Sequence, residues 1–110
     1  MIACIKKKIE KEGLGTENKP LDLNDINTSK ITDMSNLFDA LNGRLKKLSY
    51  EGYFNISNWN VSKVENMNWM FGKSAFNKDI SNWNVSSVNN MNNMFFLSPL
   101  QNNPPKWYKS

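Results

Sequence analysis

Basic and aromatic side chains share one stretch of the sequence, residues 39–55 (DALNGRLKKLSYEGYFN). Three cations are followed by three aromatic rings: Arg44, Lys46, Lys47, Tyr50, Tyr53 and Phe54. Cations attract carboxylates or phosphates, while aromatic rings anchor protein interfaces and stack on nucleic-acid bases. We therefore expect this stretch to bind an acidic protein surface or a phosphate backbone. In the alternative interpretation, Leu41, Leu45 and Leu48 form an extra amphipathic turn on the core, and the charges only face water.

Catalytic chemistry has few carriers in this sequence. There is no histidine and only one cysteine, Cys4, which excludes zinc sites of the Cys/His type, imidazole triads and disulfides within the chain. No other side chain acts as a base near neutral pH without a large pKa shift. We therefore expect a protein that is not an enzyme, with no cofactor, no metal and no small-molecule substrate.

Two nearly identical segments lie 24 residues apart, ISNWNVSKVENMNWMF (56–71) and ISNWNVSSVNNMNNMF (80–95). They differ only at Lys63/Ser87, Glu65/Asn89 and Trp69/Asn93. A weaker third version occupies 23–38, and the pattern begins once more at 96–110, where Trp107 lies 24 residues after Trp83. One unit alone buries too few apolar side chains to offset the entropy of ordering it, so stacked repeats must share a core.

The spacing inside each repeat predicts its secondary structure. Ile56, Trp59 and Val61 favour an extended stretch, and the apolar residues from Val64 to Phe71 recur at helical spacing. The sequence Ser62-Lys63-Val64-Glu65 has the form of a capping box at the start of that helix.

The ends and the insertion complete the predicted architecture, a single domain. Residues 1–13 are expected to form a capping helix with one isoleucine stripe, ended by Gly13. We therefore predict an α/β repeat fold, a short leucine-rich-repeat-like solenoid of about three units. The repeats are 23–38, 56–71 and 80–95, the insertion is 39–55, and 96–110 is a partial terminal repeat.

Functional residues are expected where one repeat departs from the others, because stacking explains the residues that the repeats share. The insertion is one such departure, and Trp69, which stands where the sister repeat has Asn93, is another. Exposed tryptophans are enriched among binding hot spots, so we predict that Trp69 and the insertion hold the partner together. The alternative is that Trp69 packs under the insertion.

The N-terminal apolar run is interrupted by three lysines after five residues, which is too short for a signal peptide or a membrane span. We therefore expect a cytoplasmic protein that does not bind membranes; a membrane-surface role for the N-terminal helix is the weaker alternative. The net charge of +4 is too diffuse to indicate nucleic acid by itself.

The segments FNKDISNWNVSSVNNMNNMF (76–95) and LNDINTSKITDMSNLF (23–38) resemble BspA-type leucine-rich-repeat surface proteins and related bacterial lipoprotein repeats. The resemblance implies a short solenoid used for adhesion or protein binding, with no catalytic constellation. We expect a non-catalytic protein-binding module acting as a cytoplasmic adaptor or inhibitor, for example a phage-type anti-CRISPR inhibitor of a defence nuclease. The alternatives are a small basic protein that contacts nucleic acid, and a fragment of a cell-surface adhesin.

Overall fold

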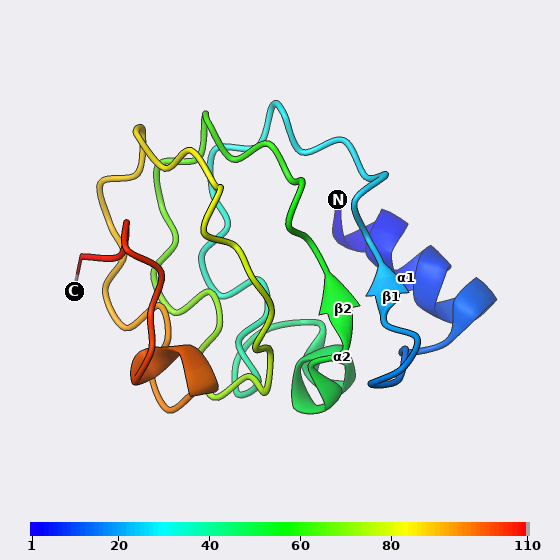
Figure 1. Cartoon of the computed structure of the whole chain (residues 1–110). Coiled ribbons are helices and arrows are strands. Elements are labelled where there is room, and N and C mark those ends of the chain that lie inside the picture. The colour runs from blue at the N-terminus through cyan, green and yellow to red at the C-terminus, as the bar shows by residue number, and fades with distance from the viewer. Residues whose placement is uncertain (110) are drawn as a thin grey trace.

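A computed structural model describes residues 1–109 of the chain. In chain order its elements are α1 (Ile2–Glu12), β1 (Leu21–Asp22), α2 (Lys46–Glu51), β2 (Phe54–Asn55) and a single 3-10 turn at Pro99–Gln101 (Figure 1). The two short strands are parallel, with Leu21 opposite Phe54 and Asp22 opposite Asn55. Turns and irregular segments connect these elements.

The predicted N-terminal helix is confirmed. Ile5 is fully buried, and Ile2 and Ile9 on the same stripe are half-buried against the core. The helix ends at Gly13, whose backbone has φ 85° and whose N–H donates to the carbonyl of Ile9 at 2.8 Å. Glycine adopts this left-handed region without the steric cost that a Cβ imposes.

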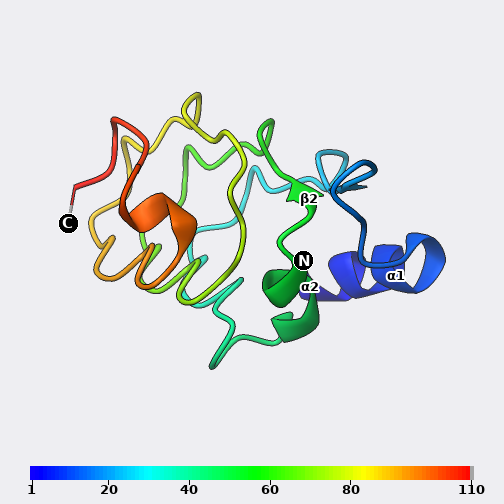
Figure 2. The same cartoon turned by 60° about the horizontal axis from the view of Figure 1, so that its bottom comes forward.

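The predicted fold class, an α/β leucine-rich-repeat-like solenoid of about three units, is wrong. Within residues 1–109 the structure is a small compact fold of 34 × 29 × 24 Å, with two α-helices and one two-stranded parallel sheet. Neither helix lies in the similar segments 56–71 and 80–95, which were expected to be half helical. The helices come from residues outside those segments (Figures 1 and 2).

Successive tight turns, rather than helices, explain the apolar spacing of three. The N–H of Val64 donates to the carbonyl of Val61 at 3.0 Å, and the N–H of Met70 donates to that of Met67 at 3.2 Å. Each such turn returns an apolar side chain to the interior, and a residue with positive φ, such as Trp69 at 58°, stops the turns from becoming a helix. The pattern therefore has helical spacing without helical backbone.

The expected capping box is also wrong, because no helix begins at Ser62. Both the N–H and the hydroxyl of Ser62 donate to the Asn60 side-chain carbonyl, at 3.0 and 2.6 Å. The corresponding Ser86 N–H donates to Asn84 at 3.1 Å. Asparagine side chains thus satisfy turn backbone groups.

The similar segments lie side by side and are joined by parallel backbone hydrogen bonds (Figures 1 and 2). Isolated bridges pair Asp33 with Asn66 and Asn66 with Asn90. Aromatic rings stack across the same segments: Phe71 lies 5.6 Å from both Phe38 and Phe95, with interplanar angles of 17° and 13°. The close sequence similarity therefore places equivalent rings in contact.

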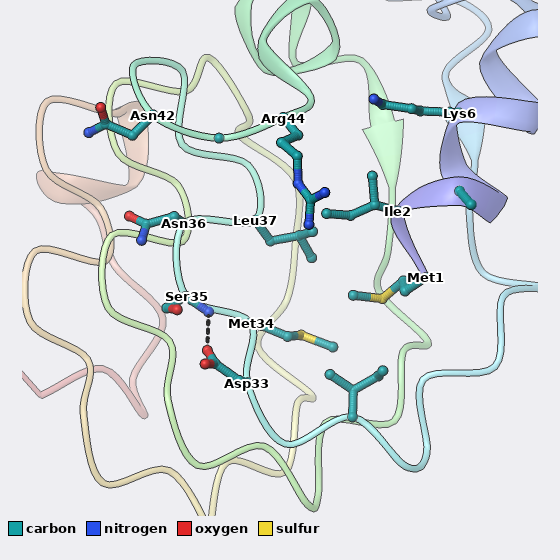
Figure 3. A pocket seen from close by; sticks show the side chains of 13 residues that line it. Met1, Ile2, Lys6, Asp33, Met34, Ser35, Asn36, Leu37, Asn42 and Arg44 are labelled. Carbon is teal, nitrogen blue, oxygen red and sulfur yellow. Dashed lines mark hydrogen bonds between the residues drawn. The ribbon is translucent and has the colours of Figure 1, made fainter.

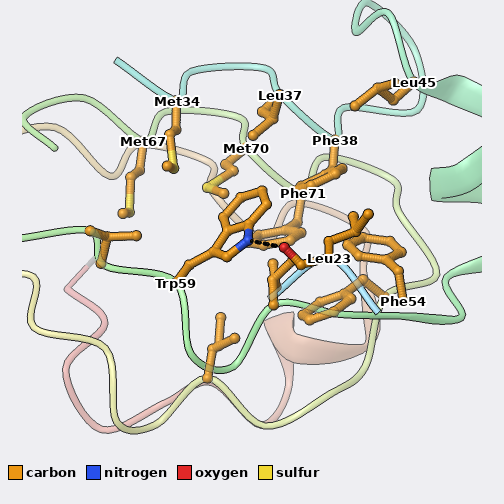
Figure 4. Close-up of a cluster of buried hydrophobic side chains, with 14 of the residues drawn as sticks. Leu23, Met34, Leu37, Phe38, Leu45, Phe54, Trp59, Met67, Met70 and Phe71 are labelled. Atoms are coloured by element: carbon orange, nitrogen blue, oxygen red, sulfur yellow. Dashed lines mark hydrogen bonds between the residues drawn. The ribbon is translucent and has the colours of Figure 1, made fainter. Parts of the chain in front are cut away.

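Tryptophan side chains donate hydrogen bonds to the backbone of the preceding segment. Trp59 donates its indole N–H to the carbonyl of Leu23 at 2.8 Å (Figure 4), and Trp83 donates to that of Ile56 at 3.1 Å. Trp107 makes the same kind of bond to Ile80 at 2.9 Å. A buried indole N–H without a partner would cost about 1–3 kcal/mol, so these bonds fix the register of the segments.

Candidate functional site

The insertion 39–55 is anchored firmly to the core. Leu45 and Leu48 are buried, and the Ser49 hydroxyl donates to the carbonyl of Phe38 at 2.6 Å. Asp39, also buried, accepts the N–H groups of Leu41 and Asn42 at 2.8 and 3.2 Å, which shapes the turn that leads to α2. The outer side of this segment is thereby held in a defined position.

The structure separates the predicted binding residues of the insertion into two groups. The cations Arg44, Lys46 and Lys47 are exposed, as is Tyr50, whose exposed fraction is 62%. Tyr53 is half-buried. Phe54, in contrast, is fully buried, with its ring 4.6 Å from Phe38 and 4.7 Å from Phe76. Phe54 is therefore a core residue, and its assignment as a partner-binding residue is corrected.

Trp69 packs against the ring of Phe96. Its indole is half-buried and meets the ring of Phe96 edge-on, with centroids 5.1 Å apart and an interplanar angle of 62°. Gly72 leaves room for the ring, since a Cβ there would lie 2.7 Å from the indole. Trp69 thus packs on Phe96, at the end of the segment that follows it in space.

A groove forms where α1 approaches α2, and we name it the basic groove. It encloses about 460 Å³, and its lining consists of Lys6, Ile9, Leu14, Gly43, Arg44, Leu45, Lys46, Lys47 and Leu48. Leucine and isoleucine side chains provide an apolar floor, and four cations surround it. Among residues 1–109 none of these four cations forms a salt bridge, because both ion pairs found there belong to Lys8.

A second groove adjoins the basic groove and shares Lys6, Gly43 and Arg44 with it. We name it the edge groove; it encloses about 690 Å³ between the start of α1 and the segment 31–37. Figure 3 shows the Arg44 guanidinium reaching toward Ile2 and Leu37. Asp33 is the acidic residue in this lining, and its carboxylate accepts the N–H of Ser35 at 2.8 Å.

An ion pair outside both linings fixes α1 to the body of the protein. Lys8 donates to the Asp25 carboxylate at 2.8 Å. This hydrogen bond raises the pKa of Lys8 above its usual value and lowers the pKa of Asp25. The helix that supplies Lys6 and Ile9 is therefore held by polar as well as apolar contacts.

The N-terminal segment contributes to the groove in a way that the sequence does not predict. Lys6, Ile9 and Leu14 lie at least 30 positions before Arg44 in the sequence, and no local pattern links them to the insertion. The amphipathic stripe of residues 1–13 indicated that this helix packs on something. It carried no signal that the helix would pack beside the insertion.

The groove has the chemistry of a binding surface. Its cations can pair with carboxylates or phosphates, and its aliphatic floor can bury an apolar side chain. Residues 1–109 contain no group of three or more potential metal ligands of the His, Cys, Asp or Glu types. None of the helices in that range is long and apolar enough to cross a membrane.

Comparison with known protein families gives a match that spans most of the chain. Residues 10–109 match the family described as "Mycoplasma protein of unknown function, DUF285". The chain belongs to this family. No curated protein and no solved structure matches the DUF285 chain. The match covers the insertion and most of the basic groove, and it excludes Lys6 and Ile9 of α1.

Proposed function

We propose that this chain is a non-catalytic protein-binding module whose basic groove holds an acidic segment of another protein. The observation that carries the proposal is the cluster of four cations around an apolar floor, with no salt bridge to any of them within residues 1–109. In this proposal the carboxylates of the partner pair with Lys6, Arg44, Lys46 and Lys47.

Most of the affinity would come from the floor of the groove. Exposed ion pairs contribute only about 0–1 kcal/mol each, whereas burying one leucine-sized side chain contributes about 1.5–3 kcal/mol. Leu14 and Ile9 are half-buried and available for such a contact. The expected partner segment therefore carries at least one apolar anchor flanked by Asp or Glu, and the cations supply orientation and attraction at long range.

The lining favours a protein over a nucleic acid. Single-stranded nucleic acids bind through aromatic platforms on which bases stack, and the groove lining contains no aromatic residue. Tyr50 is exposed on α2 but does not line the groove. The alternative prediction is a small protein that contacts nucleic acid outside the groove, where the exposed Tyr50 would be the stacking residue.

The role of the complex in the cell stays a prediction. The motif resemblance to BspA-type surface proteins supports binding or adhesion as the general activity. We propose an adaptor or inhibitor in the cytoplasm, with an anti-CRISPR inhibitor as one concrete form, and an adhesin fragment as the alternative.

A matched pair of charge-reversal variants tests the proposal. The groove variant is Lys46→Glu with Lys47→Glu, and the control is Lys63→Glu with Lys106→Glu, which makes the same change of charge at exposed lysines outside the groove. Each tagged protein is used to capture partners from a lysate of the source organism, with folding verified by near-UV circular dichroism. We expect the parent and the control to retain the same proteins and the groove variant to lose them.

Two results would contradict the proposal. Equal capture by the groove variant and the control would show that the partner binds elsewhere. Capture that disappears after nuclease treatment, and that weakens log-linearly with salt concentration, would favour the nucleic-acid alternative.

A further inference from the structure

Most backbone hydrogen bonds between the three similar segments run in the same direction. The N–H groups of Met34, Asn36 and Phe38 donate to carbonyls of the segment 56–71, at 2.8–3.0 Å. One segment further on, the N–H groups of Met67, Trp69 and Phe71 donate to carbonyls of the segment 80–95, again at 2.8–3.0 Å. At these positions each segment donates its amides to the next segment and offers its carbonyls to the previous one. Two bonds run the other way, from the Glu65 amide to the carbonyl of Thr32 at 2.7 Å and from the Asn89 amide to that of Glu65 at 2.8 Å.

The last segment has free amides at its outer edge, which we name the amide edge. The N–H groups of Met91, Asn93 and Phe95 occupy the equivalent positions and have no protein partner among residues 1–109. The next amide, of Leu97, donates to the Gln101 side chain at 3.0 Å. A hollow of about 610 Å³ lies at this edge, lined in part by Asn93, Phe95 and the C-terminal Tyr108.

The first segment has free carbonyls at the opposite end of the protein, which we name the carbonyl edge. The carbonyls of Asp33, Ser35 and Leu37 are equivalent to those that accept bonds in the later segments, and they accept none within residues 1–109. All three residues line the edge groove, beside the start of α1 (Figure 3). The carbonyl edge therefore borders a hollow, as the amide edge does.

We propose that copies of this chain associate head to tail by pairing the amide edge of one copy with the carbonyl edge of the next. The register follows from the bonds inside the chain: Met91 donates to Asp33, Asn93 to Ser35, and Phe95 to Leu37 of the neighbouring copy. Free parallel edges readily accept a further strand. Another copy of the chain fits best because its opposite edge has the complementary groups at the same spacing of two residues.

The symmetry of this contact has a measurable consequence. Its two surfaces differ, so the contact is heterologous and does not close into a dimer. The protein should form a series of sizes that grows with concentration, and sedimentation velocity of the parent chain measures that series. The association does not depend on Lys46 and Lys47, so their reversal should leave it unchanged even if the proposed basic-groove function fails.

Cysteine pairs test the register directly. Equivalent residues on neighbouring parallel strands lie about 4.8 Å apart, within the Cα separation that a disulfide spans. The exposed Cys4 is first replaced by serine. We then mix the single variants Ser35→Cys and Asn92→Cys under mild oxidation. The control mixture pairs Asn92→Cys with Asn58→Cys, which is exposed and lies in neither edge.

The same register provides an internal reference. Asn68 and Asn92 are equivalent neighbours inside one chain, where Trp69 donates to the carbonyl of Asn92 at 3.0 Å, so Asn68→Cys with Asn92→Cys should form an intramolecular disulfide. We expect the Ser35→Cys and Asn92→Cys mixture to crosslink several-fold faster than the control mixture. A monomer at all concentrations, equal crosslinking in both mixtures, or a dominant Asn92→Cys homodimer would overturn the proposal.

Discussion

Replacement of Trp69 by asparagine should cost little stability, although it removes a tryptophan. Asn36, Trp69 and Asn93 occupy equivalent positions with φ values of 59°, 58° and 56°. The left-handed region costs an ordinary L-residue about 1–2 kcal/mol, and asparagine tolerates it best among residues with a side chain. Two of the three positions therefore carry the residue type that this backbone favours, and Trp69 does not.

The magnitude follows from two opposing effects. Trp69→Asn loses the edge-on contact with Phe96, which is worth about 0.5–1.5 kcal/mol, and it relieves left-handed backbone strain of similar size. The net change in the free energy of unfolding should lie within about 1 kcal/mol. Trp69→Ala loses the same contact but keeps the strain, so it should be less stable than Trp69→Asn by about 1 kcal/mol.

Urea denaturation followed by the fluorescence of the buried Trp59 and Trp83 measures both variants. Asn93→Ala provides a second test, because it should lose about 1 kcal/mol although its side chain is exposed. Asn89→Ala, also exposed but without a positive φ, should change stability by less than about 0.5 kcal/mol. If Trp69→Ala is as stable as Trp69→Asn, backbone strain does not explain this position.

Two further predictions concern the core and the N-terminal helix. Phe71 is fully buried and contacts the rings of Phe38, Phe76 and Phe95. Phe71→Ala should therefore lower the free energy of unfolding, measured by urea denaturation, by about 3–5 kcal/mol. A loss below about 1 kcal/mol would contradict the packing described. The hydrogen bond from Lys8 lowers the folded-state pKa of Asp25 below its usual value of 3.8. The Asp25 carboxylate therefore stabilises the fold above pH 3.8, and this contribution is lost as the pH falls through the lowered pKa. Asp25→Asn should therefore flatten the acid-side decline of stability in thermal melts below about pH 4, and an unchanged decline would show that the ion pair does not persist in solution.

The sequence predicts contacts between segments better than it predicts their backbone. Near identity of 56–71 and 80–95 indicated a shared core, and Phe71 indeed stacks on Phe95. The helix expected from Val64 to Phe71 is absent, because a spacing of three arises equally from tight turns. Two features distinguish tight turns from a helix: asparagines before the turns and the positive φ at Trp69. Only the asparagines are visible in the sequence.

The candidate site was predictable only in part. Arg44, Lys46 and Lys47 are exposed as their pattern indicated, because Leu45 and Leu48 turn inward beside them. The sequence did not distinguish Phe54 from the exposed Tyr50, since whether a ring is buried depends on β2 pairing with β1. Tertiary packing of the N-terminal helix places Lys6 beside the cations of the insertion, and the local spacing of residues in the sequence does not predict this packing.

The affinity of the basic groove for its captured partner tests the central claim most directly. Isothermal titration compares the parent, the Lys46→Glu, Lys47→Glu variant and the Lys63→Glu, Lys106→Glu control at about 50 mM and about 200 mM salt. We expect the groove variant to bind about tenfold or more weakly than the control, and the parent to weaken far less over this salt range than the 10³-fold or more typical of phosphate-dominated binding. Equal affinity of the two variants would contradict the assignment of the groove as the binding site.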